Sequence, residues 1–233
     1  MKIGIIQPGS IGDIIILLPA MKVLYNQGNE IYWPIFKEHL WLFRDMVNYI
    51  NFIPVEHDVY NVVNICNKLF ETTYNVDKVY DIAATFPGSI STEEYVQCGD
   101  GNIENFDAFK YRKLNISIDE KWNLRSVIIR NQEKEDELYK KLVHNEKYAV
   151  ACLTCSQGKY NVNFDRGSGQ LIEVTPEYNI FHWIKILEHA QTIVVLNSAF
   201  FCLTEQLNLP NRKIVYRIPT PKFPVLRNKW EIL

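Results

Sequence analysis

Three short segments carry the residues whose types and spacing could do chemistry. The first, residues 7–13 (QPGSIGD), follows an apolar β-rich run, and Gly9 and Gly12 permit backbone turns that a side chain would block. Asp13 lies where the next apolar stretch begins, so its carboxylate either caps a helix or faces a ligand. The G-x-G-x-x-G spacing is absent, so this segment is not a dinucleotide-binding fingerprint.

The other two segments lie in the second half of the chain. Residues 153–159 (LTCSQGK) combine the hydroxyls of Thr154 and Ser156 with Lys159, and a lysine can supply a mobile charge to a pyrophosphate. Asn197 and Ser198 follow an apolar run and open a helix-like stretch, whose free N–H groups and positive dipole end suit a phosphate. A plainer interpretation stays open in each case, namely an exposed loop lysine and a helix N-cap.

The elements that must position these residues alternate between strand-like and helix-like runs in the first half. Gly28 ends the first helical run, and residues 86–120 lose the period, which indicates loops, an irregular helix and a passage between domains. Strands separated by helices predict a parallel sheet covered on both faces. Strands are expected at 2–7, 30–36, 52–55 and 78–83, and helices at 12–27, 39–50 and 58–70.

The second half repeats the alternation and predicts a second, smaller parallel α/β unit. We expect two Rossmann-like domains, 1–118 and 119–233, with prolines at 219, 221 and 224 marking an extended tail. Ligands of such sheets bind beyond the carboxyl ends of the strands, where all three segments fall. Strands are expected at 126–130, 148–153, 170–174, 192–196 and 213–217, and helices at 132–144, 178–189 and 198–208.

Composition limits the classes of function. The 233 residues are 47% hydrophobic and 22% charged, as in an ordinary globular protein. A net charge of −2 gives the whole molecule no electrostatic reason to coat nucleic acid or an anionic bilayer, although local basic patches remain, one at 110–113 and one in the tail. No apolar run reaches the ~18 residues of a membrane span, and no signal-peptide cleavage site follows the first residues, so a cytoplasmic location is expected.

The cysteines argue against a disulfide framework, because they are five in number and scattered. Cys152 and Cys155 form a C-x-x-C, yet a zinc site needs two further ligands at similar spacing and none of the histidines supplies them. A thioredoxin-like pair opens a helix, whereas these cysteines flank the end of an apolar run. No metal or redox role is therefore expected for them.

The first segment resembles a known family. Residues 10–13 (SIGD), followed by 14–20 (IIILLPA), are similar to the opening signature of the ADP-heptose:lipopolysaccharide heptosyltransferases, glycosyltransferase family 9. The resemblance implies that Asp13 is the general base that takes the proton of an acceptor hydroxyl, in a loop formed by Gly9, Ser10 and Gly12. Residues 80–88 resemble a further family segment that begins Y-D, but the family's second aspartate and its glutamine are missing.

The same resemblance extends loosely to the second half. It implies that Thr154, Ser156 and Lys159 bind the donor diphosphate. Residues 197–204 are similar to the family's D-T/S-G-x-x-H-x-x-A, with Ser198 retained and with Asn197, Ala199 and Cys202 in place of the aspartate, glycine and histidine. The implied fold is GT-B, with two Rossmann-like domains facing a cleft, the acceptor in the N-terminal one and the donor in the C-terminal one.

The resulting hypothesis is a metal-independent, inverting glycosyltransferase that uses a nucleoside-diphosphate sugar and no cofactor. The absence of a D-x-D motif agrees with metal independence. Three acceptors stay open: a glycan, a hydroxymethylated base in bacteriophage DNA, which the Asn-, Tyr- and Ile-rich composition suggests, and a protein or small molecule. Arg112, Lys113 and the tail cations would form the rim for DNA, and Tyr160 and Phe164 are candidates for stacking on a base. The alternative is a nucleotide-binding module that has lost catalysis.

Overall fold

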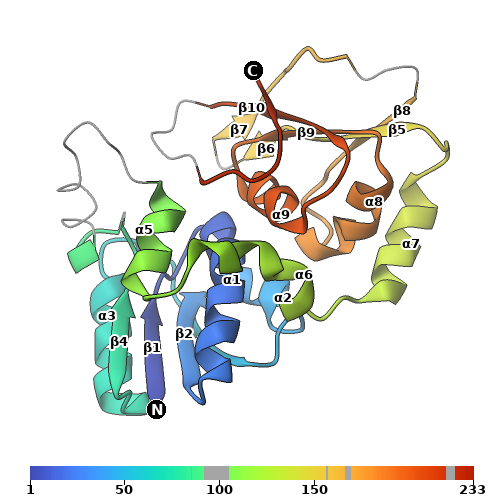
Figure 1. Cartoon of the computed structure of the whole chain (residues 1–233). Helices are drawn as coiled ribbons and strands as arrows, with labels where there is room; N and C mark the ends of the chain where they lie inside the picture. Colours follow the sequence, from blue (N-terminus) through green and yellow to red (C-terminus); the bar gives the residue numbers. More distant parts are fainter. Residues whose placement is uncertain (85, 92–104, 156, 166–168, 219–223) are drawn as a thin grey trace. The chain divides into compact units, whose positions relative to one another are not determined.

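The chain divides into two compact units in the computed structural model, which describes residues 1–84, 86–91, 105–155, 157–165, 169–218 and 224–233. The first unit comprises Met1–Ile128 with Lys222–Val225, and the second comprises Ile129–Pro221 with Leu226–Leu233. The sequence places the boundary at 118/119, within a short 3₁₀ helix of the first unit. Each unit is built on a parallel sheet with helices (Figure 1), so the predicted α/β class is confirmed.

The sheet of the first unit has the strand order β3-β2-β1-β4, and every pair in it is parallel. Its strands are β1 (Lys2–Ile6), β2 (Glu30–Phe36), β3 (Ile50–Val55) and β4 (Lys78–Asp81). The described helices are α1 (Ile11–Asn26), α2 (Leu40–Phe43), α3 (Val62–Leu69), α5 (Phe106–Lys113) and α6 (Leu124–Val127), with 3₁₀ turns η1 (Lys37–His39) and η3 (Ile118–Asn123) and a π turn η2 (Phe70–Tyr74).

Helix α1 is the centre of this unit because it is apolar on every side. Its residues from Ile14 to Met21 are all buried, which requires cover on both of its faces. The helix packs against β2 on one side and against α5, η3 and α6 on the other. Helix α3 covers the opposite face of the sheet, where Val62, Val63 and Cys66 pack against Ile6 and Phe36.

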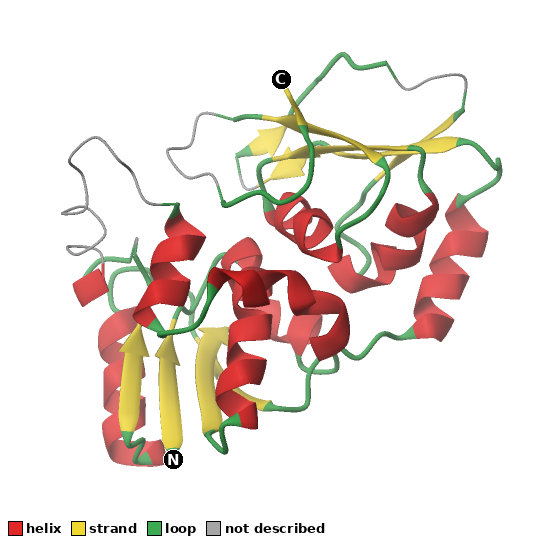
Figure 2. Cartoon of the chain, in the orientation of Figure 1, coloured by secondary structure: helices red, strands yellow, loops and turns green. Residues whose placement is uncertain are grey.

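The sheet of the second unit has the order β11-β10-β9-β5-β8, again with parallel pairs. Helices lie on one face of it (Figure 2), and Phe164 packs against the apolar cluster formed by Ala151, Val194 and Ile214. Its strands are β5 (Tyr148–Cys152), β8 (Gln170–Glu173), β9 (Thr192–Leu196), β10 (Arg212–Tyr216) and β11 (Glu231–Ile232). The helices are α7 (Gln132–Leu142), the 3₁₀ turn η4 (Ile180–Trp183), α8 (Ile184–His189) and α9 (Ala199–Leu207).

Two predicted elements are wrong. No strand forms at 126–130: the helical turn α6 ends at Val127, with Leu124 and Val127 both buried at helical spacing, and Ile128 follows as its extended C-cap residue. The helix expected at 39–50 is reduced to η1 and α2, and Ile50 already starts a strand. Among the described residues, no helix is long and apolar enough to cross a membrane.

Candidate functional site

The loop between β1 and α1 brings the first predicted segment to the carboxyl end of the sheet. Gly9 is enclosed, since a Cβ placed on it would lie 2.4 Å from Cε2 of Phe36. Ser10 is exposed and has a φ of 64°, a left-handed conformation that a non-glycine residue rarely adopts, and its side chain does not cap the helix. Gly12 and Asp13 lie in the first turn of α1 and are half-buried. The loop therefore presents Ser10 to solvent and Asp13 at its rim.

Asp13 is held by an ion pair that the sequence did not predict. Nζ of Lys110, on α5, lies 2.8 Å from Oδ1 of Asp13, and the two side chains are 4% and 20% exposed. Lys110 also donates to Oε1 of Gln7, and Nε2 of Gln7 donates to the carbonyl of Gly9 at 2.9 Å. The ion pair thus fixes the Asp13 carboxylate in position, and part of the carboxylate stays exposed. A general base needs both features, because it must reach the hydroxyl whose proton it takes.

The neighbouring strand ends add polar groups to this edge of the sheet. Asp81, at the end of β4, accepts the hydroxyl of Ser89 at 2.6 Å and the N–H of Ile90 at 2.8 Å, so its carboxylate orders the following loop. His57, after β3, stacks on Phe36 with ring centroids 4.2 Å apart and is bonded to Glu38. In the segment 80–88, which resembles the family only in part, the carboxylate of Asp81 therefore has a structural role.

In the second unit, the predicted donor residues lie at the carboxyl ends of two adjacent strands. Thr154 and Lys159 face each other across the antiparallel hairpin of β6 (Thr154–Cys155) and β7 (Gly158–Lys159), which follows β5. Ser156 lies outside the described residues. Nζ of Lys159 lies 2.6 Å from Oε2 of Glu173 at the end of β8, and both side chains are more than half exposed. A diphosphate at Lys159 has to compete with this carboxylate.

The second donor segment has a structural role in addition to any role in binding. Oδ1 of Asn197 accepts the N–H of Ile218 at 2.9 Å, which ties the end of β9 to the chain after β10. Ser198 is the N-cap residue of α9 and makes no side-chain cap bond, so its hydroxyl is not used to start the helix. Ser198 therefore occupies the N-cap position that the sequence indicates, but its side chain does not make the hydrogen bond that is typical of an N-cap residue.

The two aromatic candidates for base stacking differ in their surroundings. Phe164 is half-buried, and its ring packs on the apolar cluster of the sheet. Tyr160 lies beside Tyr216, with ring centroids 6.2 Å apart, and its hydroxyl donates to Gln157 at 3.1 Å. Tyr160 is therefore the better placed of the two to meet a planar ligand at this strand end.

The cysteines of the described chain are free thiols. Cys66, Cys152 and Cys202 are buried and Cys155 is half-buried, while Cys98 lies outside the described residues. Burial raises the pKa of Cys152 to about 12, which makes it a poor nucleophile and ligand. No group of three His, Cys, Asp or Glu side chains suited to a metal ion occurs in the part of the chain that the structure describes.

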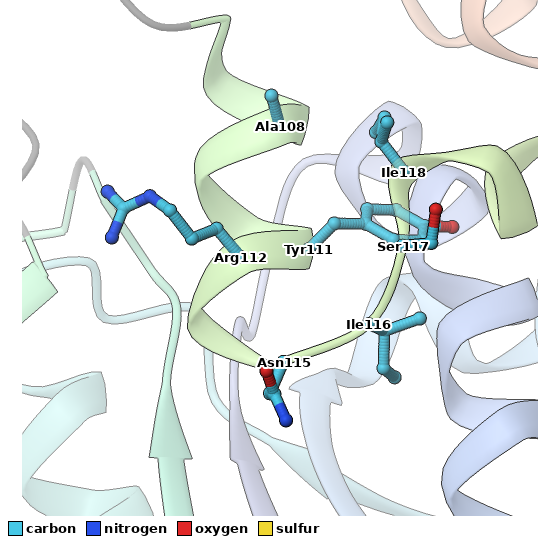
Figure 3. Close-up of a pocket in the computed structure, with 7 residues that line it drawn as sticks. All are labelled: Ala108, Tyr111, Arg112, Asn115, Ile116, Ser117 and Ile118. Atoms are coloured by element: carbon cyan, nitrogen blue, oxygen red, sulfur yellow. The ribbon is translucent and has the colours of Figure 1, made fainter.

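A surface pocket of about 390 Å³ lies on α5 and the loop that follows it. Figure 3 shows Tyr111 and Arg112 diverging from this helix toward the two sides of the view. Arg112, a candidate for the DNA rim, lines it, but no residue of the Asp13 loop or of the predicted donor segments does, so the pocket is separate from the Asp13 loop. Its lining residues are Ala108, Tyr111, Arg112, Asn115, Ile116, Ser117 and Ile118.

Lys110 and Gln7 are the site residues that the sequence analysis missed. Lys110 was grouped with Arg112 and Lys113 as a basic surface patch, but it is buried. The available signal was the spacing of Phe106, Phe109 and Lys110, which places the lysine on the apolar face of a helix. Its contact with Asp13 joins residues far apart in the chain and has no signal in a single sequence.

The tail cations proposed as a rim for DNA are partly engaged elsewhere. Nε of Arg212 pairs with Oε1 of Glu231 at 2.7 Å. Lys213 is buried and donates to the carbonyls of Leu209 and, at 3.1 Å, Asn211. These two side chains are therefore unavailable as phosphate ligands without losing their present partners.

Comparisons with known proteins identify the fold. No family model matches the sequence, and the search of curated proteins finds no significant match. A glycosyltransferase family 9 structure from Veillonella parvula DSM 2008 superposes with a TM-score of 0.62 at 12% identity, covering 100% of this chain and 85% of that one. E. coli ADP-heptose lps heptosyltransferase II gives 0.56 at 12% identity, with coverage of 100% and 90%. E. coli heptosyltransferase WaaC, solved with ADP, gives 0.52 at 13% identity, also with 100% and 90%.

These likenesses define the class. The chain has the GT-B fold, and its structural neighbours are family 9 glycosyltransferases, so the resemblance predicted from residues 10–20 is confirmed at the level of the fold. At identities of 12–13%, substrates do not transfer with the fold. A source in a bacteriophage, and a DNA acceptor, stay predictions from composition alone.

Proposed function

We propose that this protein is a glycosyltransferase that moves a sugar from a nucleoside-diphosphate sugar to an acceptor hydroxyl, with Asp13 as the general base. The observation that supports it best is the partly exposed Asp13 carboxylate, fixed by Lys110 at the carboxyl end of the first sheet. The GT-B fold supplies the context, and one of its matches was solved with ADP-2-deoxy-2-fluoro heptose. The acceptor is assigned to the first unit and the donor to the second.

The chemistry assigned to Asp13 is a single displacement. The carboxylate takes the proton of the acceptor hydroxyl while that oxygen bonds to the anomeric carbon. The bond from this carbon to the phosphate oxygen breaks, and the nucleoside diphosphate leaves with the electron pair. Attack from the face opposite the leaving group inverts the anomeric carbon, and a single base suffices for this.

The leaving diphosphate is assigned to Thr154, Ser156, Lys159 and the Asn197–Ser198 turn. Lys159 is mobile enough to exchange Glu173 for a phosphate, because the pair is exposed and such pairs contribute little to stability. Side chains and N–H groups would then carry the charge that a divalent ion carries in other enzymes, so metal independence is part of the proposal. A glycan acceptor is favoured over DNA because Arg212 and Lys213 are already engaged.

A thermal-shift panel of nucleoside diphosphates and their sugars, with and without EDTA, tests the donor site. One nucleotide family should raise Tm by binding the folded state, and EDTA should not change the shift. The Lys159→Met variant should lose most of that shift. Absence of a shift with every nucleotide contradicts the proposal, and a shift abolished by EDTA contradicts metal independence.

Turnover then separates an enzyme from a binding module. With the donor identified, Asp13→Asn should lower kcat by about 10²–10⁴-fold and leave the nucleotide-induced shift intact, because only the base is lost. Asp45→Asn is the matched control, since that carboxylate is 81% exposed and pairs only loosely with Arg44 at 3.6 Å. Equal turnover of Asp13→Asn and an active wild type contradicts Asp13 as the base, whereas nucleotide binding without turnover in either protein favours the non-catalytic alternative.

A further inference from the structure

Lys110 is a cation buried beside the proposed base, and the proposed mechanism does not use it. The residue is 3% exposed, and burial of an ammonium is costly unless it is paired and hydrogen-bonded. Its partners are the carboxylate of Asp13 at 2.8 Å and the side-chain oxygen of Gln7. The ring of Phe106, 5.9 Å from Nζ, contributes an aromatic face to the same enclosure.

Helix α5 is anchored so that Lys110 meets the first turn of α1. Phe109 and Tyr111 flank the lysine and are fully buried. The hydroxyl of Tyr111 donates to the carbonyl of Ile16 at 2.9 Å, which bonds α5 directly to α1 next to the Asp13 turn. The position of the Lys110 ammonium is therefore set by a helix that is bonded to α1, whereas a lysine at the surface would be mobile.

Gln7 connects the same ammonium to the backbone of the loop. Its side chain accepts from Lys110 and donates to the carbonyl of Gly9 at 2.9 Å, while its own carbonyl accepts Nε1 of Trp33 at 2.9 Å. Gln7 is 1% exposed, so this network is closed to solvent. Lys110 consequently fixes both the carboxylate and the loop that carries it.

We propose that Lys110 is a positioning residue for Asp13, which orients the carboxylate through Oδ1. At 4% side-chain exposure the ammonium is too enclosed to be a ligand of the acceptor itself. Its contacts with Asp13 and with Gln7, which is bonded to the carbonyl of Gly9, instead fix the direction in which the carboxylate faces. This inference rests on the proposed function, because it assigns Lys110 a role through the base.

The other charged groups around the pair are accounted for. Asp107, on the same helix, is bonded to Lys121 and not to Lys110. Asp81, on the adjacent strand, is occupied by Ser89 and Ile90. The remaining charged side chains on the elements packed against α1 are Glu30, Arg112, Lys113, Asp119, Glu120 and Arg125, and the titratable tyrosines there are Tyr32 and Tyr111.

The test compares kcat and the donor KM of wild type, Lys110→Met and Lys110→Arg, with the donor found in the thermal-shift panel. Lys110→Met should lower kcat by about 10-fold or more and leave the donor KM unchanged, because the carboxylate loses the group that orients it. Lys110→Arg keeps a cationic donor beside Oδ1 and should retain most of the wild-type kcat. In the Asp13→Asn background, Lys110→Met should have no further effect on turnover.

The outcomes distinguish this inference from the proposed function. A wild-type protein without transfer activity on any donor contradicts the proposed function, whereas an active wild type together with an unchanged kcat in Lys110→Met overturns the role of Lys110. If circular dichroism shows that Lys110→Met does not fold, Gln7→Glu replaces it. A second carboxylate on the ammonium competes with Asp13 and should also lower kcat at an unchanged donor KM, and an unchanged kcat in Gln7→Glu overturns the proposal.

Discussion

Ser10 is the most strained residue of the acceptor loop. It combines a φ of 64° with a ψ of 95°, and its side chain makes no cap bond that would offset the strain. Backbone strain of this kind costs about 1–3 kcal/mol and tends to collect at functional sites. The sequence Pro8-Gly9-Ser10 therefore places the glycine at the close approach to Phe36 and leaves the serine in the conformation that suits glycine.

Ser10→Gly should increase the free energy of unfolding by up to about 1 kcal/mol, because glycine adopts this conformation without strain. If the hydroxyl contacts the acceptor, turnover should fall in the same variant. Urea unfolding and a transfer assay measure the two effects. Asn75→Gly is the control, since Asn75 has an ordinary left-handed conformation, φ 48° and ψ 59°, that asparagine tolerates. A destabilised Ser10→Gly contradicts the strain argument.

His182 makes stability depend on pH near neutrality. Burial lowers its pKa below the usual 6.5, and the same cause lowers the pKa of His39. The unfolded chain therefore binds more protons than the folded one, so stability should rise as the pH increases through the folded pKa toward 6.5 and level off above it. The acidic groups with lowered pKa values, such as Asp136, change their protonation state below about pH 5. They therefore do not contribute to the pH dependence of stability near neutrality.

Urea unfolding between pH 5.5 and 7.5 checks this prediction. The slope of stability against pH should be positive in wild type and smaller in His182→Gln. His189→Gln is a suitable control, because that ring is exposed and its Nδ1 is bonded to the carbonyl of Lys185. A wild-type slope of zero or of opposite sign contradicts the prediction.

At the scale of the element, helix α5 is secured by a buried ion pair that also holds the C-terminal tail. The side chains of Asp107 and Lys121 are 0% exposed, with 2.6 Å between Nζ and Oδ2. Both oxygens of Asp107 lie 3.1 Å from the N–H of Val225, and Nζ of Lys121 donates to the carbonyl of Val225 at 2.6 Å. One tail residue thus has both backbone groups satisfied by the pair.

Asp107→Asn should destabilise the first unit by about 3–5 kcal/mol, because it leaves the ammonium of Lys121 buried without a counter-charge. Glu56→Gln is the contrasting case: its pair with Lys37 is 2.7 Å long, but the side chains are 73% and 59% exposed. That change should cost far less than Asp107→Asn, because water screens an exposed pair. Urea unfolding of both variants measures the difference, and equal losses would falsify the argument from burial.

The sequence predicts regular elements well where the pattern is local. The strands at 30–36 and 192–196 have the expected bounds, since both are apolar and β-branched runs between polar residues. It fails at 39–50, where Leu42, Phe43, Met46 and Val47 are buried at helical spacing but only Leu42 and Phe43 lie in a helix, the four-residue α2. The short strands β6, β7 and β11 were not predicted, because pairing partners set them and two residues carry no period.

The candidate site divides in the same way. Gly9, Asp13 and Ser198 lie at strand ends as expected, because the strand-loop-helix order alone puts them there. The partners of Asp13 and Lys159 were not foreseen, since Lys110 and Glu173 reach them through the tertiary fold. The sequence thus predicts where a chemical group lies in the fold, but it does not predict the charged side chains that contact that group.

At the scale of the whole molecule, the two units have separate sheets and separate buried polar anchors. In the second unit, Glu205 is 0% exposed and accepts the N–H of Arg227 at 2.6 Å and Nε1 of Trp230 at 2.7 Å, which secures the last residues on α9. Asp107 has the corresponding role in the first unit. Each unit therefore has a residue whose replacement should destabilise that unit alone.

Scanning calorimetry should show two transitions, because proteins with two cores commonly depart from two-state unfolding. Asp107→Asn should lower one transition and Glu205→Gln the other, and a nucleotide at 100 times its Kd should add about 2.7 kcal/mol to the transition that Glu205→Gln lowers. A single transition lowered by both variants contradicts independent units. A nucleotide that raises only the transition sensitive to Asp107→Asn places the donor in the first unit, and Asp13 then lies in the donor-binding unit and not in a separate acceptor unit.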